Sequence, residues 1–324
     1  MPDILKRESL YLGVVWDTTD RIMENQLVAE IQQLKKEKNA IILAHYYVNE
    51  ELQALADYVG DSFYLAKVAK GTDADVVVFC GVSFMGESAK MLNPEKTVLM
   101  PDITADCPMA HMAQIAKIKE LRETYEDLAV VCYINSTAEL KSYSDVCVTS
   151  SNAVKIVKNL PNQNIFFIPD MNLGRFVAEQ VPEKNVILND GYCPIHKDIT
   201  GTAVKELKKK HPDALVMVHP ECIENVVKLA DYVGSTADMI SFAKNSTCKE
   251  FIVCTEEGVN YRLREDNPDK KFYFGGEYLC RDMKLNTLEK VLHVLRTGEN
   301  EMKLPEALCE RAVKPLDRML TLAK

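Results

Sequence analysis

An internal repeat constrains this chain more than any other feature of its sequence. Three segments, at 40–62, 129–150 and 214–236, each carry an apolar run, then a histidine or tyrosine, then a stretch with helical spacing. The copies lie 88 and 86 residues apart when they are aligned on one anchor residue each: His45, Tyr133 and His219. Self-similarity at a nearly fixed period indicates a structure assembled from repeated units.

Other residues follow each anchor at a matching distance. An aspartate stands 12 positions after every anchor: Asp57, Asp145 and Asp231. A glycine stands 41, 41 and 39 positions after: Gly86, Gly174 and Gly258. Each copy alternates apolar strand-like runs with amphipathic helix-like runs, in the order strand, helix, short strand, helix, strand, helix, strand. Such alternation is typical of a parallel sheet covered by helices on both faces.

We therefore predict an α/β protein with three homologous, small, three-layer α/β domains that have parallel sheets and lie in a pseudo-threefold arrangement around a common centre. The amphipathic stretches 21–38 and 305–322 are predicted to be helices that cover outer surfaces. The predicted units are an N-terminal helix plus the first repeat, the second repeat, the third repeat, and a C-terminal helix packing on the repeats: 1–126, 127–212, 213–300 and 301–324.

Composition and charge exclude several classes of protein. With 47% hydrophobic and 27% charged residues, the chain has an ordinary globular composition. Its formal charge of −9 argues against a general attraction to nucleic acid or to anionic membranes. The first residues contain no long uncharged apolar core followed by a small-residue cleavage site, so we expect no signal peptide, and no run of about 18 apolar residues occurs. We expect a soluble, cytoplasmic protein with neither nucleic acid nor membrane as its partner.

One set of cysteines follows the repeat. Among ten cysteines and no CxxC motif, one cysteine stands 62, 60 and 61 positions after each anchor: Cys107, Cys193 and Cys280. The other seven are predicted to be buried core thiols, as free cysteine often is. Three thiolates near one axis can hold zinc or an iron-sulfur cluster. A cluster with three cysteine ligands would leave one iron open to act as a Lewis acid.

Polar residues gather where the predicted first strands end. Besides the anchors themselves, a polar residue lies two positions beyond each: Tyr47, Asn135 and Glu221. Ligands of parallel sheets bind at the carboxyl ends of strands. Acidic or hydroxyl pairs precede the next helix of each copy: Asp61-Ser62, Thr149-Ser150 and Ser235-Thr236. Such residues either cap helices or help helix N-termini to bind anions. His196, three residues after Cys193, is a candidate donor beside the cysteine.

These motifs together resemble one family, the quinolinate synthases. The resemblance spans essentially the whole chain, through LAHYY, GDS, ADCPMA, YIN, VTSSNA, GYCPIH, VHPE, GST, TEEG and CRDMKLNTL. It implies three α/β domains around a [4Fe-4S] cluster with only three cysteine ligands. It also implies the condensation of iminoaspartate with dihydroxyacetone phosphate to quinolinate in NAD biosynthesis, with loss of phosphate and two waters, and a functional link to an aspartate-oxidising enzyme.

The resemblance also implies roles for individual residues. The implied cluster ligands are Cys107, Cys193 and Cys280. The implied substrate contacts are His45, Ser62, Tyr133, Asn135, Ser150, His196, His219, Glu221 and Thr236, with Ser235 added from the helix-capping pair. Tyr47, Glu221 and His219 are the candidates for proton transfer. Two alternatives stay open: an iron-sulfur hydro-lyase acting on another dicarboxylate, and a non-catalytic metal sensor or structural zinc protein.

Overall fold

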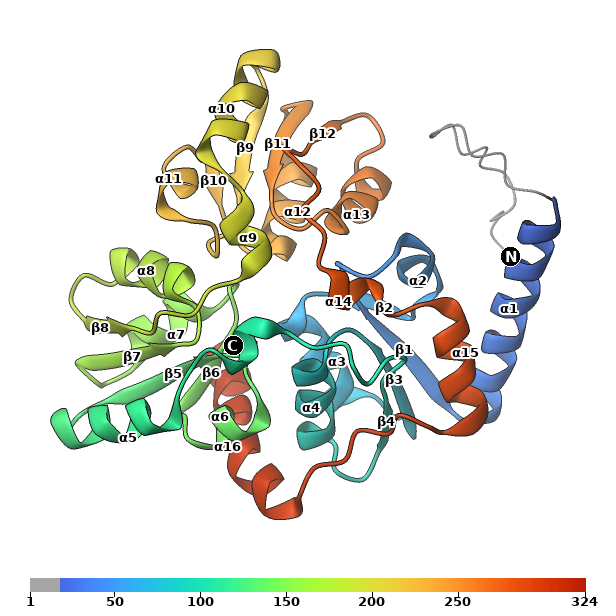
Figure 1. Ribbon diagram of the computed structural model, residues 1–324, viewed down its shortest axis with the longest axis horizontal. Helices are drawn as coiled ribbons and strands as arrows, with labels where there is room; N and C mark the ends of the chain where they lie inside the picture. Colours follow the sequence, from blue (N-terminus) through green and yellow to red (C-terminus); the bar gives the residue numbers. More distant parts are fainter. Residues whose placement is uncertain (1–17) are drawn as a thin grey trace.

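Three four-stranded parallel sheets form the framework of the molecule. The computed structural model describes residues 18–324, so the first part of the predicted unit 1–126 lies outside the described residues. Figure 1 shows three lobes arranged around a common centre, with one sheet in each lobe. The predicted α/β class, with three small repeated α/β units, is confirmed.

The strands belong to the three sheets as follows. The first sheet contains β1 Ala40–His45, β2 Tyr58–Gly60, β3 Val76–Cys80 and β4 Thr97–Leu99. The second contains β5 Ala129–Tyr133, β6 Val146–Val148, β7 Asn164–Ile168 and β8 Asn185–Leu188. The third contains β9 Leu215–Val218, β10 Tyr232–Val233, β11 Glu250–Cys254 and β12 Lys271–Tyr273.

Helices separate the strands and cover the sheets. In the first lobe they are α1 Thr18–Glu37, α2 Glu50–Leu55, α3 Ser62–Gly71 and α4 Ser83–Leu92, followed by the 3₁₀ helix η1 Pro108–His111. In the second lobe they are α5 Ile115–Thr124, α6 Ala138–Ser142, α7 Ala153–Asn159, α8 Met171–Gln180 and α9 Pro194–Asp198. The remaining helices are α10 Gly201–Lys210, α11 Glu224–Val227, α12 Thr236–Asn245, α13 Val259–Asp266, α14 Arg281–Lys284, α15 Leu288–Thr297 and α16 Glu306–Leu322.

The three sheets share one topology and one register. In each sheet the second strand in sequence lies at the edge, the first lies beside it, and the third and fourth follow. The first and second strands pair with the same sequence offset of 15 residues: His45 with Gly60, Tyr133 with Val148, and Val218 with Val233. The predicted order of strands and helices within each copy is therefore confirmed.

The repeated aspartates have a structural role in this register. The side chain of Asp57 accepts a hydrogen bond from the N–H of Ile42 at 2.7 Å, and its own N–H donates to the Ile42 carbonyl. Asp145 makes the same two bonds with Val130, and Asp231 makes them with Val216. Each aspartate thus bonds to both the N–H and the C=O group of one residue in the first strand of its sheet, which explains why it recurs in every copy.

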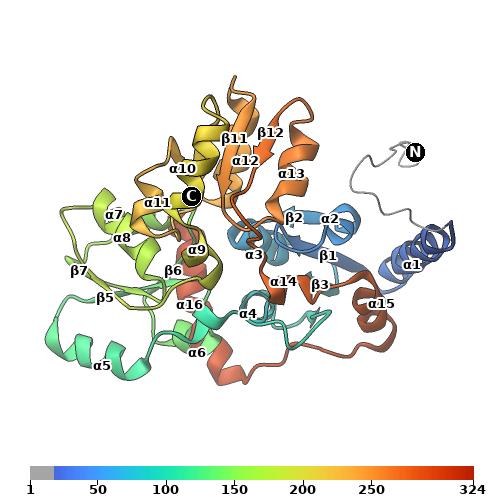
Figure 2. The same cartoon turned by 45° about the horizontal axis from the view of Figure 1, so that its top comes forward.

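Apolar side chains of the strands fill the cores, and the C-terminal helix α16 joins the first two lobes. All five residues of β5 are buried, as are four of the five in β3, β7 and β11. The predicted C-terminal helix is present as α16, which packs on α6, β6 and α4 and so contacts the first two lobes (Figures 1 and 2). Within 18–324, no helix combines the length and apolarity needed to cross a membrane.

The domain ranges stay predictions, because the observed packing crosses them. α15 lies within the predicted third unit, 213–300, but it packs against α1 and β3 of the first lobe. Its apolar face carries Leu288, Val291 and Leu295, which are buried in the same core cluster as the first sheet. A sequence repeat defines which units are related, whereas an amphipathic helix can cover any neighbouring apolar surface.

Not all of the remaining cysteines are buried as predicted. Cys80 and Cys254 are buried in β3 and β11, and three others are buried as well: Cys132, Cys147 and Cys222. Cys248 and Cys309 are only partly buried, although each packs against a core cluster, so the prediction holds for them only in part.

Candidate functional site

A cavity of about 270 Å³ lies where the carboxyl ends of the three first strands meet. Each lobe contributes its anchor residue and the polar residue two positions further on. Ten of the predicted non-cysteine site residues line this cavity: His45, Tyr47, Ser62, Tyr133, Asn135, Ser150, His196, His219, Glu221 and Thr236. The repeat therefore brings together side chains that lie up to 191 positions apart in the sequence.

The three repeat-related cysteines line the same cavity. Each one directly precedes a short helix: Cys107 before η1, Cys193 before α9 and Cys280 before α14. All three thiols are free. Burial raises the pKa of Cys107, and the neighbouring Cys280 raises it further. Burial likewise raises the pKa of Cys193, with further increases from Glu221 and Cys107. Thiols that disfavour one another's ionisation are suited to a cationic metal centre, which binds thiolates and releases their protons.

Two of the anchor histidines have the same local geometry. The Nδ1 atom of His45 accepts a hydrogen bond from the N–H of Tyr47 at 3.2 Å, and Nδ1 of His219 accepts one from the N–H of Glu221 at 3.3 Å. Burial lowers the pKa of each ring to about 3. Both histidines are therefore neutral at pH 7 and carry their proton on Nε2.

Glu221 is the charged centre of the site. Its Oε2 lies 2.7 Å from Nδ1 of His196 and 3.5 Å from Nδ1 of His219. Burial opposes ionisation, but His196 and then His219 outweigh it and lower the pKa of the carboxyl to about 2. Sγ of Cys193 lies 3.2 Å from Nδ1 of His196. Cys193, His196 and Glu221 form a group whose potential metal-ligand atoms lie within 4.8 Å of one another.

Two buried oxygens in the cavity wall have no hydrogen-bond partner among residues 18–324. They are Oε1 of Glu221 and Oδ1 of Asn135. Buried polar atoms in proteins are nearly always paired, and an unpaired one calls for an explanation. Both oxygens are acceptors, so a bound molecule with N–H or O–H groups would satisfy them.

A chain of hydrogen bonds joins residues of all three lobes behind the cavity. The hydroxyl of Tyr47 lies 2.7 Å from Oγ1 of Thr236 and 2.9 Å from Oγ1 of Thr255. The same Thr255 oxygen lies 2.9 Å from Nε2 of His196, whose other ring nitrogen contacts Glu221. Thr255 is fully buried, and it connects the tyrosine of the first lobe to the histidine of the second.

The hydroxyl pairs occupy two different kinds of position. Ser62 and Thr236 are the first residues of the ten-residue helices α3 and α12, capped by Asp61 and Ser235. Ser150 differs, because α7 begins only at Ala153 and Ser150 lies in the preceding turn. The second pair therefore precedes its helix with two residues between them, whereas the second member of each other pair is already helical. In that copy Asn152 accepts the N–H of Thr149 and closes a turn ahead of the helix.

Ser235 does not line the cavity. It is fully buried, its hydroxyl donates to the carboxylate of Asp238 at 2.6 Å, and it accepts the N–H of Asp238 at 3.2 Å. This reciprocal capping box occupies the side chain. Ser235 therefore caps the N-terminus of α12, while Thr236 lines the cavity.

The sequence reasoning missed Thr255 and the cavity-lining Glu256. Both follow β11, at the carboxyl end of a strand, and TEEG lies at 255–258. The rule that strand ends carry ligands could have found them. Neither has a chemically similar counterpart in both other copies, so alignment of the repeats did not single them out.

Comparison with known proteins agrees with this geometry. The family model described as Quinolinate synthetase A protein matches residues 29–321. A protein of Fusobacterium nucleatum named Quinolinate synthase is 53% identical over 293 residues, which cover 90% of this chain and 98% of that protein. Proteins with the same name from Clostridioides difficile and Aquifex aeolicus are 51% and 48% identical over 93% and 92% of this chain, and 100% and 94% of their own lengths. The chain belongs to the quinolinate synthetase A protein family.

Proposed function

We propose that this chain is a quinolinate synthase of NAD biosynthesis. It condenses iminoaspartate with dihydroxyacetone phosphate to give quinolinate, one phosphate and two waters. These products contain all the atoms of the two substrates, so the reaction needs no oxidant or reductant. The observation that carries the proposal is the convergence of polar groups and thiols from three related lobes on one cavity, in a chain of this family.

We also propose that Cys107, Cys193 and Cys280 hold a [4Fe-4S] cluster. Three free thiols at equivalent positions of the repeat line the same cavity, and this donor set fits an iron-sulfur cluster that keeps one iron without a protein ligand. When bound, such a cluster supplies a Lewis acid that polarises a substrate hydroxyl or carbonyl.

The chain's own residues supply sites for the charged groups of the substrates. The N-termini of α3 and α12, at Ser62 and Thr236, present the positive end of a helix dipole and the first-turn N–H groups other than those that Asp61 and Ser235 cap. Ser150 adds a hydroxyl from the second lobe. These groups suit the two carboxylates of iminoaspartate and the phosphate of the triose, in a protein whose net charge is negative.

The neutral histidines and the unpaired oxygens orient the remaining polar atoms. His45 and His219 carry a proton on Nε2 and can donate it as a hydrogen bond to a substrate oxygen. Asn135 and Glu221 each offer an unpaired acceptor for an imine N–H or a hydroxyl. Donors and acceptors from three lobes thereby hold the two substrates in contact, which lowers the entropic cost of condensation.

Glu221 and Tyr47 are assigned the transfer of protons. Glu221 is ionised, because the neighbouring His196 outweighs the effect of burial and lowers the pKa of the carboxyl to about 2, and it can accept a proton at Oε1. Tyr47 stays protonated, because burial raises its pKa well above the usual value, so it can donate a proton. His219 is a neutral ring beside Glu221 and is the third residue assigned to proton transfer. Proton transfer by groups placed in this way is general acid and base catalysis.

Iminoaspartate implies a functional link to another enzyme. An imine of this kind hydrolyses readily in water, so it must be made close to the time of use. A flavin- or nicotinamide-dependent enzyme that oxidises aspartate is the reaction class able to supply it.

The test is an anaerobic assay of quinolinate formation from iminoaspartate and dihydroxyacetone phosphate. Wild-type protein should form quinolinate and phosphate in equal amounts. Glu221→Gln and Tyr47→Phe should each lower turnover by roughly 100-fold or more, as expected when a general acid or base is removed. Undiminished turnover in both variants would refute the assigned roles. Absence of quinolinate with wild-type protein, together with dehydration of a hydroxy-dicarboxylate, would favour a hydro-lyase instead.

A further inference from the structure

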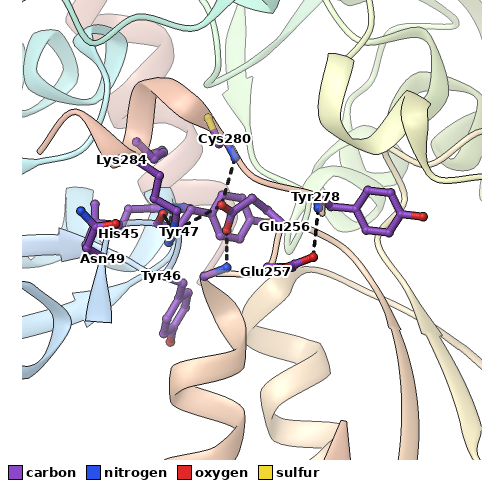
Figure 3. Close-up of polar contacts among 12 residues, drawn as sticks. His45, Tyr46, Tyr47, Asn49, Glu256, Glu257, Tyr278, Cys280 and Lys284 are labelled. Carbon is purple, nitrogen blue, oxygen red and sulfur yellow. Dashed lines mark hydrogen bonds and ion pairs between the residues drawn. The ribbon is translucent and has the colours of Figure 1, made fainter. Parts of the chain in front are cut away.

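Glu256 is a buried residue whose carboxyl group accepts hydrogen bonds from two backbone segments, one at Gly258 and one at Cys280. Its Oε1 accepts the N–H of Cys280 at 3.0 Å, and its Oε2 accepts the N–H of Gly258 at 2.6 Å. The side chain is 1% exposed. Figure 3 shows Glu256 between these two segments, with the thiol of Cys280 on the opposite side of its residue from the hydrogen bond.

Lys284 extends this contact to the first lobe. Its Nζ lies 3.5 Å from Oε1 of Glu256 and donates to the carbonyl of Tyr47 at 2.7 Å (Figure 3). Lys284 is the last residue of α14, the helix that begins directly after Cys280. The ammonium group of Lys284 therefore offsets the charge of the buried Glu256, and it links the segment that follows Cys280 to Tyr47, which lines the cavity.

The second lobe contains the same device at the equivalent position. Asp170 stands two residues after the end of β7, as Glu256 stands two residues after the end of β11. Its Oδ2 accepts the N–H of Cys193 at 3.0 Å, and its Oδ1 accepts the N–H of Leu173 at 2.7 Å. Asp170 is fully buried. In the first lobe this position is Val82, whose side chain has no hydrogen-bond acceptor.

We propose that Glu256 and Asp170 are positioning residues that aim the thiols of Cys280 and Cys193 into the cavity. Each carboxyl group holds the amide of its cysteine and so restrains the backbone from which rotation about the Cα–Cβ bond places the sulfur atom. Partners of metal ligands act in this way, by orienting the ligand rather than by touching the metal. The inference rests on the proposed function, because it takes these cysteines as the ligands of the cluster.

The two oxygens of Glu256 predict a graded response to substitution. Alanine removes both acceptors, so the buried N–H of Gly258 and the part-buried N–H of Cys280 lose their partner. Glutamine keeps one acceptor oxygen, but its amide group cannot accept the second N–H. Glu257 offers a matched control, because its carboxylate accepts the N–H of Tyr278 at 3.0 Å in the same loop and, among the described residues, it makes no hydrogen bond to Cys280 (Figure 3).

The experiment measures release of iron from the anaerobically purified holoprotein to a ferrous chelator, and the electron paramagnetic resonance spectrum of the dithionite-reduced cluster. We expect release from Glu256→Ala to be roughly 10- to 100-fold faster than from wild type, with Glu256→Gln in between and Glu257→Ala at the wild-type rate. The spectrum should change in both Glu256 variants and stay unchanged in Glu257→Ala.

The outcomes separate this inference from the function on which it rests. Wild-type protein without iron and sulfide would contradict the cluster itself. A wild-type cluster with an unchanged release rate and spectrum in Glu256→Ala would overturn the positioning role alone. If Glu256→Ala does not fold, as judged by circular dichroism, Glu256→Gln and Asp170→Asn carry the test, and wild-type release and spectra in both would overturn it.

Discussion

Thr255 allows the hydrogen-bond chain behind the cavity to be tested with one nearly isosteric change. Replacing it with valine exchanges the hydroxyl for a methyl group and removes two contacts, to Tyr47 and to His196, each 2.9 Å long. Tyr47 keeps its bond to Thr236, so its loss is one ordinary hydrogen bond. Nε2 of His196 keeps no other partner that the structure describes, and the ring is 1% exposed.

The size of the effect follows from these two losses. One hydrogen bond contributes about 1 kcal/mol net, and a buried polar atom left unpaired costs about 1 to 3 kcal/mol. We therefore expect Thr255→Val to lower the free energy of unfolding by about 2 to 4 kcal/mol. With an entropy of unfolding of about 2.1 cal/mol/K per residue, that corresponds to a fall in Tm of roughly 3 to 6 °C for this chain of 324 residues.

The assay compares thermal unfolding of wild type, Thr255→Val and Thr255→Ser by circular dichroism. The serine variant keeps the hydroxyl and loses only a methyl group, so it should remain within about 1.5 kcal/mol of wild type. Combining Thr255→Val with Tyr47→Phe should cost about 1 kcal/mol less than the sum of the single changes, because both remove the same bond. If the valine and serine variants are equally stable, the hydrogen-bond chain contributes nothing and this reasoning is refuted.

Three further predictions test the close contacts of the fold and the charge state of the site. Gly258→Ala should lower both stability and activity, because an added Cβ would lie 2.7 Å from Cα of Tyr47 and 2.8 Å from the carbonyl oxygen of Tyr46; wild-type Tm and turnover would contradict it. Asp145→Ala should cost about 1 to 3 kcal/mol in urea unfolding, since the N–H of Val130 loses its 2.7 Å acceptor, and a change under 0.5 kcal/mol would be evidence against the role of the repeated aspartates. Burial lowers the pKa of His45 from 6.5 to about 3, so the unfolded chain binds one more proton than the folded chain between these pH values. The free energy of unfolding should therefore decrease as the pH falls from 6.5 towards 3, by up to about 1.4 kcal/mol per pH unit. His45→Gln should flatten this dependence.

The repeat made most of the fold predictable. The strands are short apolar runs, and the repeated aspartates lie at one fixed distance from the anchors because each pairs with a strand residue 15 positions earlier. Since the copies share these contacts, they also share register, and register brings the anchors to one cavity. The positions of His45, Tyr133 and His219 at the carboxyl edges follow from the sequence pattern alone.

Residues outside the repeat were harder to predict, for physical reasons. Thr255 acts through contacts with the other two lobes, and Glu256 acts through the backbone of Cys280 and Gly258. The corresponding positions in the first copy are Gly81 and Val82, which offer no such side chains. Lys284 gains its place only because α14 packs against the first lobe. Ser235 shows the opposite case, in which a residue that matched the repeat uses its hydroxyl to cap α12.

The most direct test of the central claim is the iron and acid-labile sulfide content per chain after strictly anaerobic purification, measured for wild type and for Cys193→Ala. The account predicts about four of each in the wild type and their loss in the variant, because a cysteine ligand of a [4Fe-4S] cluster is removed. Zinc in place of iron, bound for example at Cys193, His196 and Glu221, would contradict it. So would a full cluster that survives in Cys193→Ala.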